Sequence, residues 1–214
     1  MEKNNYQYEI LIADVKTYYQ NRSQNLSLEE EERDDCPGAG STNFSPLKPN
    51  NFHLGNYAGF YAYQEFLDEL DSMLLHYPNL ISARAPIDTF LTHEGRPIYW
   101  VRISDNPNMN ENEKEVLYTA LHHAREPVSL SANIFYMWYL LENYGTDPEV
   151  TYLVDNTEMY FVPMINPDGY RHNELTDPNG GGMHRKNRHL VSGGSGNPGV
   201  DLDRNYSYHR YESG

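Results

Sequence analysis

The stretch EKEVLYTALHHAREPVS, residues 113 to 129, joins an apolar run to a cluster of histidine, arginine and glutamate. The apolar half is rich enough in aliphatic side chains to predict a buried β-strand. Pro127 is typical of the first turn of a helix, and the helical pattern that follows runs to Gly145, a predicted C-cap. The polar residues therefore follow a strand and precede a helix, and open α/β sheets place their ligand sites at that edge.

Within this stretch, His123 and Glu126 allow three interpretations: a metal site, a general base with its orienting partner, or a polar strand end. Imidazole and carboxylate both suit zinc, and a short turn can bring donors three residues apart to one ion. His122 is expected to point to the opposite face if the strand continues through it. Because His-x-x-Glu is a short motif that arises often by chance, the stretch alone leaves all three interpretations open.

The segments on either side predict alternating helices and strands. Apolar residues at helical spacing predict a helix over 63–78, which Pro78 ends. Extended runs at 80–91 and 98–105 are joined by a turn, and 157–165 predicts another strand that closes in the turn NPDG, 166–169. Strands that alternate with helices predict an α/β fold, here a mixed central sheet with helices on both faces.

The amino-terminal quarter has a different composition. Residues 1–23 look like the tail of a preceding, pro-like segment, and 24–50 is acidic and then rich in Pro, Gly, Ser and Asn. Such a stretch buries little apolar surface, so we interpret 24–50 as a linker. The acidic run 29–35 is expected to be a solvated tether, with an interaction tail as the alternative. Residues 51–214 are predicted to belong to the main domain.

The charge and the cysteine content exclude several classes of function. The net charge is −15 and the pI about 4.9, which disfavours binding to nucleic acid or to anionic membranes. Cys36 is the only cysteine, so neither an internal disulfide nor a cysteine-based zinc site is expected. No apolar run is long enough to predict a transmembrane helix, and the first residues do not resemble a signal peptide. The compartment is left open by these observations.

Three arginines strengthen the metal interpretation. Arg125 lies between the two candidate ligands, Arg185 lies in HRKNR, 184–188, and Arg204 lies in GVDLDRNY, 199–206. Arginine binds carboxylates through its planar fork, so arginines beside a metal suggest a substrate with a free carboxylate and a carbonyl to be polarised. Taken alone, HRKNR is equally compatible with a solvated basic loop, and Arg204 with a structural ion pair.

The motifs HHAREP, PMINPDGY, HRKNR and GVDLDRNY, in this order and spacing, resemble the zinc metallocarboxypeptidases related to pancreatic carboxypeptidase A. In style they are most similar to the bacterial, carboxypeptidase T-like members. The resemblance covers about residues 55 to 207. It implies a Zn²⁺ cofactor, with His123 and Glu126 as two of three zinc ligands. It also implies that Asp201 accepts a hydrogen bond from His123 and so selects its tautomer.

The resemblance also implies substrate contacts. Arg125 and Arg185 would contact substrate carbonyls, Arg185 would in addition stabilise the oxyanion, and Arg204 would bind the terminal carboxylate of a peptide. The family has Asn before the carboxylate-binding arginine, whereas this chain has Asp203. A second carboxylate beside that of the substrate is repulsive, so Asp203 is expected to weaken binding at neutral pH unless it is protonated or turned away.

In the family, the third zinc ligand and the general base follow well after the position of Arg204, and nothing up to Gly214 matches them. We therefore expect this chain to be the amino-terminal part of the catalytic domain and to be inactive by itself. The expected function of the whole protein is hydrolysis of the carboxy-terminal residue of peptides, outside the cell or in the periplasm, as in the family. The alternative is a non-catalytic module that binds peptide carboxyl termini.

Overall fold

The computed structural model describes residues 10, 12–15, 17–18, 48–190 and 199–206. Its regular elements, in chain order, are α2 (Tyr63–His76), β1 (Ala85–Pro86), β2 (Tyr99–Ile103), β3 (Lys114–Thr119), α3 (Val128–Asn143), α4 (Pro148–Asp155), β4 (Thr157–Val162) and α5 (Pro167–Thr176). Most of the predicted tail 1–23 and of the predicted linker 24–50 lies outside the described residues. The division of the chain into tail, linker and domain therefore stays a prediction.

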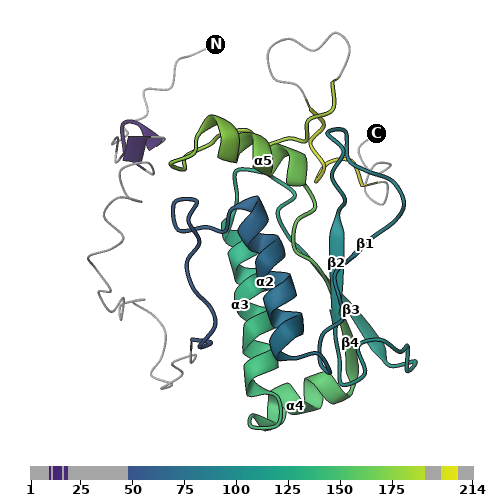
Figure 1. Ribbon diagram of the computed structural model, residues 1–214. Helices are drawn as coiled ribbons and strands as arrows, with labels where there is room; N and C mark the ends of the chain where they lie inside the picture. Colours follow the sequence, from purple (N-terminus) through teal and green to yellow (C-terminus); the bar gives the residue numbers. More distant parts are fainter. Residues whose placement is uncertain (1–9, 11, 16, 19–47, 191–198, 207–214) are drawn as a thin grey trace, which may run out of the picture.

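The four strands form one sheet in the order β1-β2-β4-β3 (Figure 1). β2 is antiparallel to β1 and to β4, whereas β3 and β4 are parallel, so the sheet is mixed. The chain reaches β4 from β3 through α3 and α4, because parallel neighbours need a long crossover. The predicted mixed sheet with flanking helices is confirmed.

Helices α2 and α3 lie side by side over one face of the sheet (Figure 1). Alternate residues of the central strands point to them, so Val101 and Ile103 of β2 and Met159 and Phe161 of β4 are fully buried. Facing them are buried side chains of both helices, among them Leu70, Met73, Ile134, Met137 and Trp138. The described residues do not form the expected cover on the second face, where Leu117 of β3 is 64% exposed.

Three local predictions need correction. The run 80–91 contributes the short strand Ala85–Pro86 and an isolated bridge from Ile81 to Ile103 of β2, where we expected a longer strand. β3 is not buried, because it is the outer strand of the described sheet and has a neighbour on one side only. The motif at 166–169 is not a closing turn but the first turn of α5.

Two helices begin at the same kind of signal. The side chain of Asp147 caps α4 by accepting hydrogen bonds from the backbone N–H of Glu149 and of Val150. The side chain of Asn166 caps α5 in the same way, and a proline follows each cap at the first helical position. Proline is favoured there because its missing N–H would have no partner in the helix. No helix in the described part of the chain has the length and apolar character needed to cross a bilayer.

Candidate functional site

The chain bends sharply between β3 and α3, and this bend brings the polar residues of the 113–129 stretch together. Leu121 is buried yet has a φ of 52°, in the left-handed region that a bulky side chain rarely adopts. Its N–H donates to Oγ of Ser129, 3.0 Å away, and its carbonyl accepts from the N–H of Asn166 at 3.1 Å. These two contacts, from α3 and from the cap of α5, hold the bend in place.

His123 lies just beyond this bend with both ring nitrogens next to carboxylates. Its Nδ1 is 3.0 Å from Oε2 of Glu126, and its Nε2 is 3.1 Å from Oδ1 of Asp201. The His123 side chain is 10% exposed, whereas that of Glu126 is half exposed. Asp201 therefore holds the ring through Nε2, and Nδ1 faces Glu126.

This arrangement suits a zinc ion between His123 and Glu126. Tetrahedral zinc with bonds of about 2.0–2.1 Å sets its ligand atoms about 3.3 Å apart, close to the observed separation of Nδ1 and Oε2. A carboxylate beside the second ring nitrogen is the usual partner of a metal-binding histidine. It keeps the ring proton on that nitrogen and leaves the lone pair of the other nitrogen free to bind the metal. The site thus offers two ligand atoms and a group that orients one of them.

Asp201 contacts three basic side chains of the site: His123, Arg185 and Arg204. Its Oδ2 lies 3.2 Å from Nε of Arg185 and 3.6 Å from Nε of Arg204. Partial burial opposes ionisation of Asp201, but the hydrogen bonds from His123 and Arg185 outweigh it and lower the pKa of Asp201. Asp201 is thus held as the anion that the orienting role requires.

Arg185 joins the two carboxylates of the site. Besides its contact with Asp201, its Nη1 is 3.2 Å from Oε1 of Glu126. Its backbone is anchored beside the 113–129 stretch, since its carbonyl accepts from the N–H of Ala124 at 2.9 Å. Asn173 of α5 strengthens this junction, because its Nδ2 donates to the carbonyls of Ala124 and His184. Asn173 was not predicted as a site residue, because it is a single polar residue in a helical segment with no motif around it.

The other predicted substrate contacts are on the surface. The Arg204 side chain is 80% exposed, and its one ion pair within the described ranges is with Asp201. Arg125 is exposed, and no ion pair within the described ranges engages it. Asp203 is also exposed, near His122 and Tyr206, on whose ionisation its charge acts. The structure thus groups His123, Glu126, Asp201 and Arg185 closely, and leaves the remaining three at the rim.

None of the described histidines completes the metal site. β3 ends before His122, whose Nε2 lies 2.8 Å from the hydroxyl of Tyr206. His184 is paired through Nε2 with the carbonyl of Asn187 at 3.2 Å. His209 lies outside the described residues.

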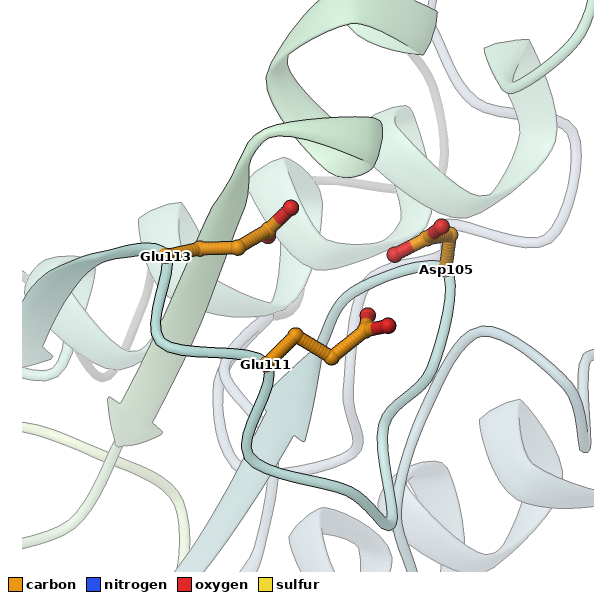
Figure 2. Close-up of side chains that lie close together, drawn as sticks. All are labelled: Asp105, Glu111 and Glu113. Carbon is orange, nitrogen blue, oxygen red and sulfur yellow. The ribbon is translucent and has the colours of Figure 1, made fainter.

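A different group of carboxylates lies at the opposite end of the sheet (Figure 2). Asp105 follows β2, and Glu111 and Glu113 precede β3; one oxygen of each lies within 4.8 Å of the others. We call these three residues the acidic cluster. Oε2 of Glu113 is buried without a hydrogen-bond partner in the described residues. Loss of hydration, followed by the charges of Asp105 and Glu111, raises the pKa of Glu113.

Comparison with known proteins gives one consistent family. The family model described as zinc carboxypeptidase matches residues 67–214. The chain is 32% identical over 152 residues to "Zinc carboxypeptidase" of Saccharothrix mutabilis subsp. capreolus, which covers 71% of this chain and 33% of that protein. It is 30% identical over 203 residues to "Inactive metallocarboxypeptidase ecm14" of Talaromyces marneffei, covering 93% of this chain and 32% of the relative.

The fold is also that of solved carboxypeptidases. The crystal structure of carboxypeptidase A from Helicoverpa armigera superposes with a TM-score of 0.64 and 24% sequence identity, over 94% of this chain and 43% of the other. This chain spans about a third of the length of the two curated relatives named above. Because the family model covers more than half of the sequence and the motifs that predicted the family lie inside it, this chain belongs to the zinc carboxypeptidase family.

Proposed function

We propose that this chain forms the part of a zinc carboxypeptidase that holds the metal with His123 and Glu126 and receives the carboxyl end of a peptide. The observation that carries the proposal is the placement of His123, with one ring nitrogen 3.0 Å from Glu126 and the other 3.1 Å from Asp201. Zinc in such a site supplies Lewis-acid polarisation of a carbonyl and activation of water for hydrolysis.

The arginines divide the binding of substrate between them. Arg204 is exposed and has enough free donors to pair with a terminal carboxylate, which makes the site selective for free carboxyl ends. Arg185 has one edge held by Glu126 and Asp201, so its position is fixed before substrate arrives. A fixed guanidinium beside the scissile carbonyl stabilises the negative charge that develops on its oxygen. Arg125 is available for a second carbonyl of the peptide.

The described residues provide two ligand atoms for zinc, so the third ligand and the general base are expected among residues outside them. We propose that turnover requires those residues as well, and the 214-residue chain is expected to be inactive by itself. As the family resemblance implies, the proposed location is outside the cell or in the periplasm, which fractionation of the source cells would test.

Zinc binding by the 214-residue chain tests the metal site. We expect weak binding, measured by competition with a chromophoric chelator, that is lost in both His123→Ala and Glu126→Ala. His184→Ala is the matched control, because His184 precedes Arg185 in the chain but its ring bonds to the carbonyl of Asn187. Equal affinity in the wild-type chain and in His123→Ala would contradict the proposed ligands.

A second candidate function, binding of peptide carboxyl ends without hydrolysis, is favoured by two observations. One relative carries the word inactive in its name, and Asp203 replaces the expected Asn beside Arg204. A longer form of the protein that contains the third ligand separates the two functions. Release of a terminal amino acid from a peptide supports the enzyme, and binding of the same peptide without release supports the module.

A further inference from the structure

Two histidines from distant parts of the chain meet beside the loop that carries Arg185. Nδ1 of His93 lies 3.3 Å from Nδ1 of His189, and the centroids of the two rings are 4.2 Å apart. His93 lies between β1 and β2, and His189 directly follows the HRKNR segment, 184–188. Within 48–190 and 199–206, no carboxylate or carbonyl pairs with either ring, so each ring has only the other as a polar partner.

The turn that carries His93 is fixed by a buried carboxylate. The turn closes through the N–H of Thr92, which donates to the carbonyl of Arg96 at 2.9 Å. Asp168 of α5 is 2% exposed and accepts from Oγ1 of Thr92 at 2.7 Å and from the N–H of Glu94 at 3.0 Å. Both chain neighbours of His93 are thus tied to the same buried group, which limits how far its backbone can move.

The backbone of His189 is held in a comparable way. Oδ1 of Asn187 accepts from the N–H of His189 at 3.1 Å and from the N–H of Val200 at 2.7 Å. Between these residues, Nε of Arg188 donates to Oε1 of Glu94 at 3.1 Å. This ion pair joins the chain neighbour of one histidine to the chain neighbour of the other. The two rings are therefore brought together by contacts that do not involve the rings themselves.

The separation of the two nitrogens suits a shared metal ion. Nitrogen ligands about 2.0–2.1 Å from a four-coordinate ion stand about 3.3 Å apart, which is the observed separation of the Nδ1 atoms. Imidazole nitrogen is a preferred ligand of Cu²⁺, Ni²⁺ and Zn²⁺. The neighbouring arginines do not oppose a cation with unpaired charge, because Arg96 pairs with Asp168 and Glu94, and Arg188 pairs with Glu94.

We infer that Nδ1 of His93 and Nδ1 of His189 form a second metal site, separate from His123 and Glu126, for a divalent ion that prefers nitrogen ligands. Cu²⁺ binds such ligands more tightly than Ni²⁺ or Zn²⁺. Two protein ligands leave the other coordination positions to water. The bound ion cross-links the turn before β2 to the loop that carries Arg185. The inference does not rest on the proposed function, because it uses none of the residues assigned there.

Copper binding to the 214-residue chain tests the site. His123→Ala serves as the parent, so that the proposed zinc site is already removed. In slightly alkaline buffer, where imidazole is deprotonated, Cu²⁺ affinity is measured by competition with glycine. Adding His93→Gln or His189→Gln should weaken binding by at least about tenfold, because loss of a ligand costs more than the roughly 10- to 100-fold that loss of a partner of a ligand costs.

The matched control is a second pair of histidines on the same side of the molecule. The rings of His172 and His184 are 4.9 Å apart, but they meet edge to face, and Nε2 of His184 already lies 3.2 Å from the carbonyl of Asn187. His172→Gln and His184→Gln should therefore leave Cu²⁺ affinity unchanged. Equal losses from both pairs would overturn the site, since they would show that copper binds histidines without regard to their geometry.

A second measurement needs no substitution at either ligand. In the His123→Ala chain labelled with ¹⁵N-histidine, Zn²⁺ should shift the Nδ1 signals of His93 and His189 together and leave those of His172 and His184 in place. Shifts at Nε2, or at only one of the two rings, would overturn the shared site. Unmoved signals of His93 and His189 at saturating Zn²⁺ would show that the two rings form a hydrogen-bonded pair only.

Discussion

Carboxylates gather at both ends of the sheet, and the two ends treat them in opposite ways. Beyond the carboxyl end of β3, Glu126 and Asp201 alternate with His123 and Arg185, and each carboxylate contacts both of these basic side chains. At the other end, no ion pair within the described residues engages the acidic cluster, and its members repel one another. Like charges are close at both ends, but within the described residues only Glu126 and Asp201 have basic side chains beside them, whereas the acidic cluster has none.

Glu158 lies near the acidic cluster but, unlike its members, is paired with an arginine. Removing that arginine is expected to change the free energy of unfolding more than any other substitution of these residues. Oε2 of Glu158 lies 2.8 Å from Nη1 of Arg102, and both side chains are buried. Arg102→Ala leaves the charge of Glu158 buried and unpaired, which should lower the free energy of unfolding by roughly 3–5 kcal/mol. Urea denaturation followed by circular dichroism measures this.

The double variant Arg102→Met with Glu158→Gln is the control for that prediction, because it removes both charges together. It should recover most of the lost stability, since buried ion pairs are often replaceable by neutral side chains. If the single and double variants were equally unstable, the packing of Arg102 rather than its charge would be the cause.

At the other end of the sheet, Arg185→Ala should lower kcat in a catalytically competent, longer form of the protein. Loss of one fixed donor to a developing oxyanion costs roughly 100- to 1000-fold. Arg188→Ala is the control, because Arg188 lies in the same loop but pairs with Glu94, away from the site. A rise in KM with unchanged kcat would show that Arg185 binds ground state and transition state equally.

A smaller effect is expected from Asp201→Asn, which keeps the shape of the orienting side chain but removes its charge. Loss of such a partner typically lowers metal affinity roughly 10- to 100-fold, because the histidine is less basic and less well oriented. Competition with a chelator measures zinc affinity, and Asp203→Asn, two residues away and exposed, should leave it unchanged. Equal losses in the two variants would point to net charge rather than to the contact with His123.

The smallest effect is expected in the acidic cluster, from Glu113→Gln. The pKa of Glu113 is raised on folding, so its ionisation costs stability once the pH rises above the ordinary carboxyl range. Glu113→Gln should therefore raise Tm slightly at neutral pH and lose this advantage in acid, where wild-type Glu113 is also neutral. Glu115→Gln, on the exposed start of β3, is the control, and an equal gain there would make the effect one of overall charge.

Much of the fold follows from patterns that act over short distances. The helices α2 and α3 and the strand β4 form where they were predicted, and each ends one to three residues before its predicted end. α4 and α5 were missed although Asp147 and Asn166, each followed by proline, are recognisable caps. The exposure of β3 was not predictable from its composition, since it depends on which strands lie beside it.

The site shows the same limit. The proximity of His123 and Glu126 was predicted from their spacing, whereas the contact of Asp201 with His123 was implied only by the family resemblance. The contacts of Arg185 with Glu126 and Asp201 were not predicted. The supports of the site, Ser129 and Asn173, carry no signal in the sequence, because a single polar side chain in a helix is usually solvated. Their roles depend on what the tertiary fold places opposite them.

The strained backbone of Leu121 has a consequence for protein design. A left-handed conformation costs a bulky residue about 1–2 kcal/mol, and here it persists because Ser129 and Asn166 hold the amide and the carbonyl of that residue. The short motif around His123 would therefore not keep its conformation if it were transferred alone to another protein. Grafted onto another α/β scaffold without a hydroxyl in the next helix and a capped helix beyond it, the loop would relax, and the imidazole and carboxylate would no longer converge.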